Sequence, residues 1–192
     1  MKTVIMAGGK GTRISSVAKD IPKPMIKIGD RPVLEHEIDC LRDQGYTDLI
    51  ITVSHLGQII MDYFGDGSKR SPVTGKPFGV HIEYYFEQVP LGNAGSLFRL
   101  KNKLTEDFLL LNADSLFNVD FDLFVAFHRE KGGLATLFTH PNSHPYDSGL
   151  VIIDENHVVT QWLTKEDTRP TYYQNRVNAG IHVISPKLLD VQ

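Results

Sequence analysis

The chain has 192 residues, of which 41% are apolar and 22% are charged, a composition that excludes disordered, collagen-like and coiled-coil proteins. Twenty basic and 23 acidic side chains leave a formal net charge of −3 without a dense block of Lys or Arg, which argues against nucleic acid as a partner. No apolar run approaches the ~18 residues that span a bilayer, and the N-terminus lacks the features of a signal peptide. We therefore expect a cytoplasmic protein with no membrane association.

Apolar runs alternate with segments of helical period, a pattern typical of strands joined through helices. Strands are predicted at residues 3–7, 49–54, 80–86, 108–112, 134–139, 150–154, 157–162 and 177–184. Helices are predicted at residues 32–44, 57–63, 94–103 and 121–131, the last with Asp120 as its N-cap, and residues 64–79 are expected to form a turn-rich loop. The fold class predicted is α/β, a Rossmann-like mixed and mainly parallel sheet flanked by helices.

The second half of the chain differs from the first. Its strands follow one another after Gly133 with short connections, which predicts antiparallel hairpins beside a parallel core, and we expect them to form a wall of the substrate site. The chain ends one turn into a Pro-initiated helix without a stop signal, so we expect a longer parent protein with room for a further C-terminal domain. Cys40, the single cysteine, is expected to be a buried or half-buried thiol in a helix.

A glycine-rich turn follows the first predicted strand directly. Residues 8–13 read Gly-Gly-Lys-Gly-Thr-Arg, in which the glycines allow backbone N–H groups to approach an anion closely while Lys10 and Arg13 supply positive charge. The spacing matches neither of the two commonest nucleotide-binding glycine motifs. Its place at the carboxyl end of a strand, where open α/β sheets bind ligands, favours a phosphate-binding loop over an ordinary surface turn.

Two further charged residues stand where the backbone is constrained. Lys23 lies between Pro22 and Pro24, which restrict the backbone on both sides of it, although such a segment is also compatible with a solvent-facing turn. Asp114 ends an apolar strand at the predicted carboxyl edge of the sheet, where a carboxylate suits Mg²⁺ together with phosphate oxygens. The alternative for Asp114 is a cap on the next turn.

In this order, the motifs resemble those of the sugar-1-phosphate nucleotidyltransferases. The family signature runs G-G-x-G-T-R, P-K-P-M, P-L-G-T-A-G, an apolar strand ending in G-D, and N-A-G-I. This chain has GGKGTR at 8–13, PKPM at 22–25, PLGNAGSL at 90–97, FLLLNAD at 108–114 and NAGIHV at 178–183. The resemblance implies the nucleotide-diphospho-sugar transferase fold, with residues 1–192 forming a nucleotidyltransferase domain that lacks its C-terminal segment.

The resemblance also implies a reaction and its residues. A phosphate oxygen of a sugar 1-phosphate would attack the α-phosphorus of a nucleoside triphosphate and expel pyrophosphate, in the synthesis of sugar nucleotides for polysaccharides. Arg13 would hold the triphosphate and the leaving group, Lys23 would bridge the reacting phosphates, and Asp114 would bind Mg²⁺, since two anions must be neutralised and aligned without a protein nucleophile. The nucleotide-binding residues implied are Ala7, Gly8, Gly9, Lys10, Gly11, Thr12, Arg13, Glu87 and Gly92.

Two departures from the family pattern concern the metal site. Ala113-Asp114 replaces the usual Gly-Asp, which keeps the carboxylate but adds a methyl group next to it. The family's second metal-binding aspartate comes well after the N-A-G-I strand, and only about ten residues of this chain follow Ile184. We therefore expect the chain by itself to be weakly active or inactive.

The chemistry of Glu87, at a base-contacting position of the family, favours GTP. A carboxylate only accepts hydrogen bonds, and guanine alone offers adjacent N1–H and N2–H₂ donors on one edge. Thymine and uracil present a single ring donor between two carbonyl groups, and cytosine presents no ring N–H. The neighbouring Gln88 could serve in place of Glu87, and a solvated Glu87 remains an alternative.

For the sugar phosphate, the resemblance indicates Gly149, Lys165 and Asn178. Lys165 would pair with the phosphate, Asn178 would contact ring hydroxyls, and Gly149 would leave room beside the pyranose. Thr164 stands where the family generally has a glutamate that grips sugar hydroxyls, and Asp147 or Ser148 could replace that contact. The identity of the sugar is therefore left open.

The preferred hypothesis is a Mg²⁺-dependent enzyme most like mannose- or heptose-1-phosphate guanylyltransferases, with a nucleoside triphosphate and a sugar 1-phosphate as its small-molecule partners. The first alternative is a phosphocholine cytidylyltransferase of the same fold. The second is a non-catalytic module that binds sugar nucleotides, and a dinucleotide-dependent dehydrogenase is a distant third because its glycine fingerprint is absent. The sequence is compatible with a homo-oligomer.

Overall fold

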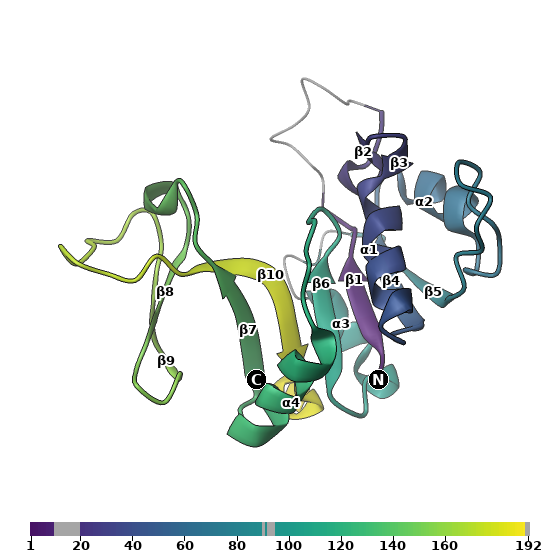
Figure 1. The fold of residues 1–192 in the computed structure, drawn as a ribbon. Coiled ribbons are helices and arrows are strands. Elements are labelled where there is room, and N and C mark those ends of the chain that lie inside the picture. The colour runs from purple at the N-terminus through teal and green to yellow at the C-terminus, as the bar shows by residue number, and fades with distance from the viewer. Residues whose placement is uncertain (10–19, 90, 92–94, 191–192) are drawn as a thin grey trace. The chain divides into compact units, whose positions relative to one another are not determined.

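The computed structural model describes residues 1–9, 20–89, 91 and 95–190. These residues form two compact units (Figure 1). The first unit consists of Met1–Thr136 and His182–Gln192, and the second unit consists of Leu137–Ile181. Each unit is described by itself below.

A parallel sheet forms the centre of the first unit. Its strands β1 (Thr3–Met6), β4 (Asp48–Val53), β5 (His81–Phe86) and β6 (Phe108–Asn112) lie in the order β5-β4-β1-β6. All three of these pairings are parallel, with Thr3 opposite both Leu49 and Leu109. Near-continuous apolar runs in β4 and β6 are buried, as expected for parallel strands covered on both faces. The predicted α/β fold class is confirmed.

Helices connect these strands. They are α1 (Val33–Asp43), α2 (Gly57–Phe64), α3 (Gly95–Arg99) and α4 (Phe121–Lys131), with shorter 3₁₀ turns η2 (Lys23–Met25), η3 (Lys101–Lys103) and η5 (Pro186–Asp190). The bounds of α4 match the prediction, and Asp120 Oδ1 accepts a hydrogen bond from the Leu123 N–H at 3.0 Å, as expected of an N-cap. The single helix predicted at 94–103 is instead α3 followed by η3. Its last turn is tightened because the Leu100 N–H is shared between the carbonyls of Ser96 and Leu97.

A small hairpin precedes α1 and was not predicted. Strands β2 (Lys27–Ile28) and β3 (Arg31–Pro32) pair antiparallel across a turn in which Gly29 has a φ of +63°. Two residues per strand are too few to show an alternating pattern in the sequence. The residues between α2 and β5 are the turn-rich loop that was predicted, with one isolated bridge between Arg70 and Pro77.

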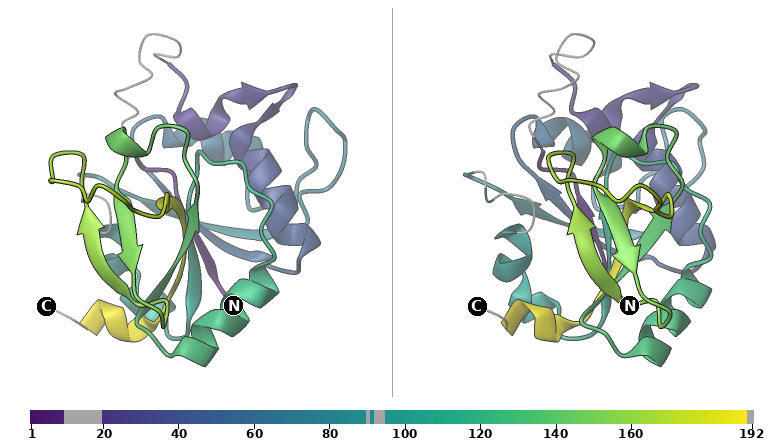
Figure 2. Two further views of the ribbon diagram at one scale, coloured as in Figure 1. Left: turned by 60° about the vertical axis from the view of Figure 1, so that its left-hand side comes forward. Right: turned by 90° about the vertical axis from the view of Figure 1, so that its left-hand side faces the viewer.

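The second unit is built from antiparallel strands (Figure 2). Strands β8 (Leu150–Ile153) and β9 (Val159–Leu163) form the predicted hairpin, and β8 also pairs antiparallel with β10 (Val177–Ile184). Strand β7 (Ala135–His140) pairs with β10, and the 3₁₀ turn η4 (Pro145–Asp147) precedes β8. Strand β9 starts two residues later than predicted, because Asp154 Oδ1 accepts hydrogen bonds from the N–H groups of Asn156 and Val158 and holds a turn there.

Candidate active site

The carboxyl ends of four neighbouring parallel strands carry polar or glycine residues. Gly8 and Gly9 follow β1, Ser54 follows β4, Glu87 follows β5 and Asp114 follows β6 by two residues. The Ser54 hydroxyl donates to the Gly8 carbonyl at 2.5 Å, and the Glu87 N–H donates to the Val53 carbonyl at 2.7 Å. This edge is where an open α/β sheet binds its ligands.

Gly8 lies directly against the Glu87 carboxylate. A Cβ atom at Gly8 would lie 3.0 Å from Glu87 Oε1 and 3.1 Å from its Cδ, so a side chain at this position would push the carboxylate away. Glu87 is only 8% exposed. A solvated Glu87, one of the alternatives left by the sequence, does not agree with this burial. Ala7 is also buried, and its N–H completes the sheet by donating to the Thr52 carbonyl at 2.9 Å.

Lys23 and Asp114 come together. Lys23 Nζ lies 3.7 Å from Asp114 Oδ2, and the two side chains are 26% and 48% exposed. Lys23 opens the η2 turn, in which the Met25 N–H donates to the Pro22 carbonyl at 2.8 Å and the side chains of Pro24 and Met25 are buried. The turn therefore fixes the backbone from which the Lys23 side chain extends, as the flanking prolines predict. Lys10, Gly11, Thr12, Arg13 and Gly92 lie outside the described residues.

The sequence motifs do not indicate a buried carboxyl group that lies close to Asp114. Glu37 on α1 is 1% exposed, and its Oε1 accepts a hydrogen bond from the Ser115 N–H at 2.9 Å. Burial raises the pKa of Glu37 well above its usual value, the Ser115 N–H opposes this rise, and the negative charge of Asp114 adds to it. The signal was present, because Glu37 shares helical spacing with the apolar core residues Leu34 and Leu41.

The three residues implied for the sugar phosphate lie in the second unit, at one end of its strands. Val177 of β10 and Leu163 of β9 both lie opposite Leu150 of β8. One residue further along, antiparallel register therefore sets Asn178 and Thr164 on either side of Gly149, and Lys165 follows Thr164. These residues come together although they are up to 29 positions apart in the chain.

Their individual contacts are also defined. A Cβ atom at Gly149 would lie 3.0 Å from Nε1 of Trp162, so the glycine makes room for that indole ring. The Asn178 side-chain oxygen accepts from the Gly180 N–H at 3.1 Å. The Lys165 side chain is 64% exposed, and its Nζ lies 4.0 Å from Glu166 Oε1. Thr164 is engaged locally, because its hydroxyl and its N–H both donate to the Asp167 carboxylate, at 2.8 and 2.7 Å.

The family follows from a comparison of the whole chain with known proteins. A model of the family described as nucleotidyl transferase matches residues 2–192. The chain belongs to this family. Two relatives are a UTP--glucose-1-phosphate uridylyltransferase of Synechocystis sp., 34% identical over 204 residues, and a mannose-1-phosphate guanyltransferase of Saccharomyces cerevisiae, 28% identical over 196 residues. The matches cover 99% and 100% of this chain but 50% and 52% of the relatives, so the chain spans about half the length of these proteins.

A solved structure agrees with this assignment. HddC from Yersinia pseudotuberculosis, complexed with GMP-PN, superposes with a TM-score of 0.78 at 26% identity. The match covers 100% of this chain and 79% of the HddC chain. The nucleotidyl transferase fold predicted from the motifs is therefore confirmed.

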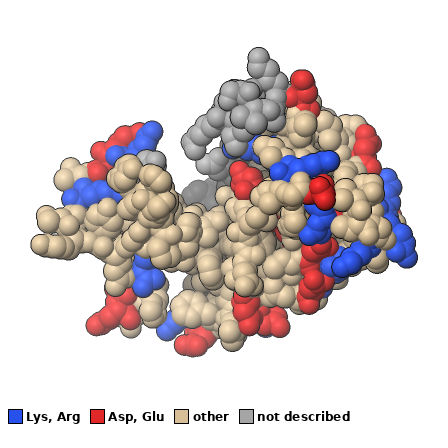
Figure 3. Space-filling model, turned by 45° about the horizontal axis from the view of Figure 1, so that its top comes forward, with Lys and Arg blue, Asp and Glu red and all other residues tan. Residues whose placement is uncertain are grey.

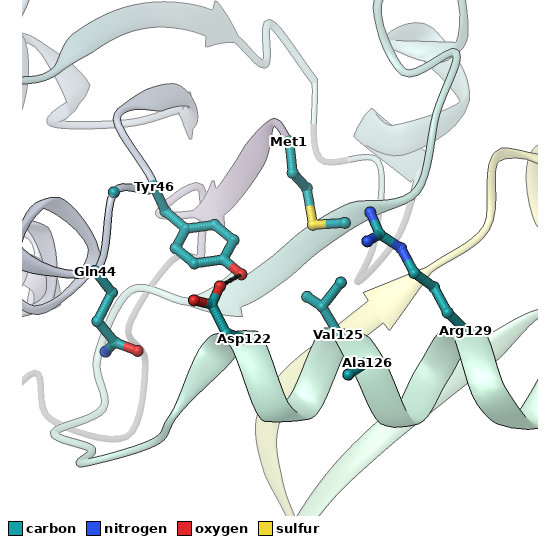
Figure 4. A pocket seen from close by; sticks show the side chains of 8 residues that line it. Met1, Gln44, Tyr46, Asp122, Val125, Ala126 and Arg129 are labelled. Carbon is teal, nitrogen blue, oxygen red and sulfur yellow. Dashed lines mark hydrogen bonds between the residues drawn. The ribbon is translucent and has the colours of Figure 1, made fainter.

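A hollow of about 390 Å³ is lined by none of the site residues discussed above (Figure 4). It lies near the start of β1, beside the turn that follows α1. The Tyr46 hydroxyl donates to Asp122 Oδ1 at 2.9 Å there, and Met1 and Arg129 also line the hollow.

On the face shown in Figure 3, basic and acidic side chains are interspersed. Within the described residues, no helix has the length and apolar character needed to cross a bilayer.

Proposed function

We propose that the protein to which this chain belongs is a sugar-1-phosphate nucleotidyltransferase. A phosphate oxygen of the sugar 1-phosphate attacks the α-phosphorus of the nucleoside triphosphate, the bond to the bridging oxygen breaks, and pyrophosphate leaves. The observation that carries this proposal is the Lys23–Asp114 pair, at 3.7 Å, on the sheet edge where Gly8 and Gly9 follow β1. A cation and a carboxylate beside a glycine-rich turn suit a metal–triphosphate complex.

The roles of the charged residues follow from the charges that must meet. The acceptor and the triphosphate are both anions, so Lys23 lowers their repulsion and aligns them, and Arg13 of the glycine-rich segment holds the leaving pyrophosphate. Gly8 and Gly9 allow the backbone close approach to the phosphates. A Cβ atom at Gly9 would have no described atom within 4 Å.

Asp114 is the residue that would hold Mg²⁺. Its carboxylate is half-exposed at the end of β6, and among the described residues there is no cluster of three or more His, Cys, Asp or Glu side chains. This donor set fits Mg²⁺, which usually takes one or two carboxylates and completes its shell with phosphate oxygens and water. When bound, Mg²⁺ supplies positive charge to the triphosphate and the leaving group.

We further propose that the base is guanine. Glu87 is buried beside Gly8, and its carboxylate would accept from the N1–H and N2–H₂ groups of guanine; the related HddC structure is complexed with GMP-PN. UTP is the competing candidate, because the Synechocystis relative is named a uridylyltransferase. A cytoplasmic location, the absence of a nucleic acid partner and self-association stay predictions.

A matrix of substrates tests these proposals. Pyrophosphate release is measured with GTP, UTP, dTTP or CTP, each combined with mannose 1-phosphate, glucose 1-phosphate or phosphocholine. We expect the fastest release with GTP and a sugar 1-phosphate. Release with CTP and phosphocholine would support the cytidylyltransferase instead, and nucleotide-dependent thermal stabilisation without any release would support the non-catalytic module.

Variants separate the two parts of the proposal. Lys23→Met and Asp114→Asn are expected to lower turnover by about 10²-fold or more. Glu87→Gln is expected to reduce the preference for GTP over UTP by about tenfold, because the amide replaces one acceptor by a donor. Glu83→Gln is the matched control, since Glu83 is on β5, the strand that Glu87 follows, but pairs with Lys103. A preference for UTP in the parent chain overturns the guanine assignment and leaves the reaction class intact.

A further inference from the structure

Arg169 makes the most extensive side-chain contacts to backbone carbonyls in the second unit's loops. Its Nη1 donates to the Pro145 carbonyl, and its Nη2 donates to the Ser148 carbonyl at 2.5 Å and to the Thr164 carbonyl at 3.5 Å. The guanidinium is partly buried in the first two of these contacts. One side chain therefore reaches two segments that are separated by more than a dozen residues.

The two segments are those that carry the predicted sugar-phosphate residues. Ser148 is followed by Gly149, and Thr164 is followed by Lys165. The pairing of Leu150 with Leu163 brings the segments together at the end of the β8–β9 hairpin, but strand pairing stops there. Beyond that point, each segment keeps a backbone hydrogen bond of its own, and the Arg169 side chain donates to carbonyls of both.

Each segment also contains side-chain hydrogen bonds of its own. In the first, the Asn142 side-chain amide donates to the Ser148 hydroxyl at 2.8 Å. In the second, the Asp167 carboxylate accepts from both the hydroxyl and the N–H of Thr164. The planar guanidinium joins these two locally ordered turns, and its fork of donors can bind carbonyls in both, which the single ammonium of a lysine reproduces poorly. Hydrogen bonds from a charged donor are also stronger than neutral ones.

We propose that Arg169 is a positioning residue for the sugar-phosphate acceptor, which acts by holding the Gly149 and Lys165 segments at a fixed separation. This inference rests on the proposed function, because it takes Gly149 and Lys165 as acceptor-binding residues. Because the guanidinium of Arg169 donates to backbone carbonyls, it shapes the acceptor site and does not bind the phosphate. The glutamate that the family generally has at position 164 is absent here, and Thr164 instead forms part of the turn that Arg169 holds.

The test compares Arg169→Met with Arg176→Met. Both variants remove one guanidinium from the second unit, but the Arg176 side chain donates to Gln174 Oε1 within its own segment. The KM values for the nucleotide and for mannose 1-phosphate or glucose 1-phosphate are measured by pyrophosphate release. We expect Arg169→Met to raise the acceptor KM by about tenfold or more with a nucleotide KM within about twofold of the parent chain. Arg176→Met is expected to change neither, and Arg169→Lys to fall between.

Two physical measurements accompany the kinetics. Trp162 is the only tryptophan and its indole lies against Gly149, so its fluorescence reports acceptor binding directly. Hydrogen exchange of the amides at 144–148 and 164–168 reports the order of the two segments, and we expect it to accelerate in Arg169→Met alone. Far-UV circular dichroism identifies a variant that has unfolded, in which case Arg169→Lys carries the comparison.

The outcomes distinguish this inference from the function on which it rests. If neither the unsubstituted chain nor any longer protein that contains it releases pyrophosphate with any sugar 1-phosphate, the proposed function fails first and the acceptor role fails with it. If the parent is active and Arg169→Met leaves the acceptor KM unchanged, the inference is overturned and the function stands. Equal rises in both KM values also overturn it, because they indicate a general loss of structure.

Discussion

Replacing Glu37 by glutamine tests whether this buried carboxyl group holds a proton in the folded chain. The side chain is 1% exposed, and burial is the largest cause that raises its pKa above the usual value of 4.5. An acid with a raised folded pKa keeps its proton in the folded state at pH values where the unfolded chain has already lost it. Its contribution to stability is therefore full below about pH 4.5 and is lost as the pH rises through the folded pKa.

The expected size follows from the same linkage. Each unit by which the folded pKa exceeds the unfolded one lowers the free energy of unfolding at high pH by about 1.4 kcal/mol. Glutamine does not titrate, and its amide oxygen can still accept from the Ser115 N–H. The stability of Glu37→Gln relative to the unsubstituted chain should therefore increase with pH above about 4.5 and level off above the folded pKa of Glu37.

Urea unfolding, followed by far-UV circular dichroism at about pH 5, 7 and 9, measures this difference. Glu35→Gln is the matched control on the same helix: Glu35 is equally buried, but its carboxylate accepts from the Tyr63 hydroxyl at 2.6 Å and lies 3.5 Å from Arg31. Removing that charge is expected to destabilise the chain by about 1–3 kcal/mol. A Glu37→Gln difference that is the same at all three pH values would refute a buried, protonated carboxyl group.

Three further predictions concern stability and are checked by the same urea titrations. Gly67→Ala is expected to lower the free energy of unfolding by about 3 kcal/mol or more, because its φ is +85° and the added methyl would lie 2.3 Å from the Val80 carbonyl oxygen. The control Gly75→Ala, at φ +68° with no described atom within 4 Å, should lower it by only about 1–2 kcal/mol. Equal losses in the two variants would argue against the clash. Phe64→Ala should lower the free energy of unfolding by about 3–5 kcal/mol, since the ring is fully buried and its centroid lies 4.9 Å from that of the Phe78 ring. Phe64→Leu should lower it clearly less. Burial lowers the pKa of His182 below 6.5, so its contribution to stability is lost as the pH falls below that value, and His182→Gln should flatten this decline.

Local chemistry predicted most elements of this chain. The bounds of α4, β6 and β10 agree with the prediction, because each combines a clear hydrophobic period with a defined start or stop. The Asp120 cap was predictable for the same reason, since its hydrogen bond spans only three residues. The hairpin β2–β3 and the turn at Asp154 were not, because two-residue strands and side-chain bonds to the backbone leave little trace in a periodicity pattern.

The order of the motifs indicates the family from the sequence alone, and the match over residues 2–192 confirms it. The positions of the proposed site residues can be predicted only coarsely from the sequence. Strand ends can be assigned to one edge of a sheet from the sequence. The distance between Lys23 and Asp114 cannot, because 90 intervening residues and the packing of η2 determine it.

The amino-acid sequence alone predicts the alternation of strands and helices, the family and the residues that bear charge near the predicted phosphates. These depend on side-chain periodicity and on motifs of a few residues, which are local. Only the tertiary structure showed that Glu37 lies under Ser115 and that Arg169 joins the segments before Gly149 and Lys165. Such contacts depend on strand order and helix packing, which arise from the sum of many weak interactions across the whole chain and leave no signal at any single position.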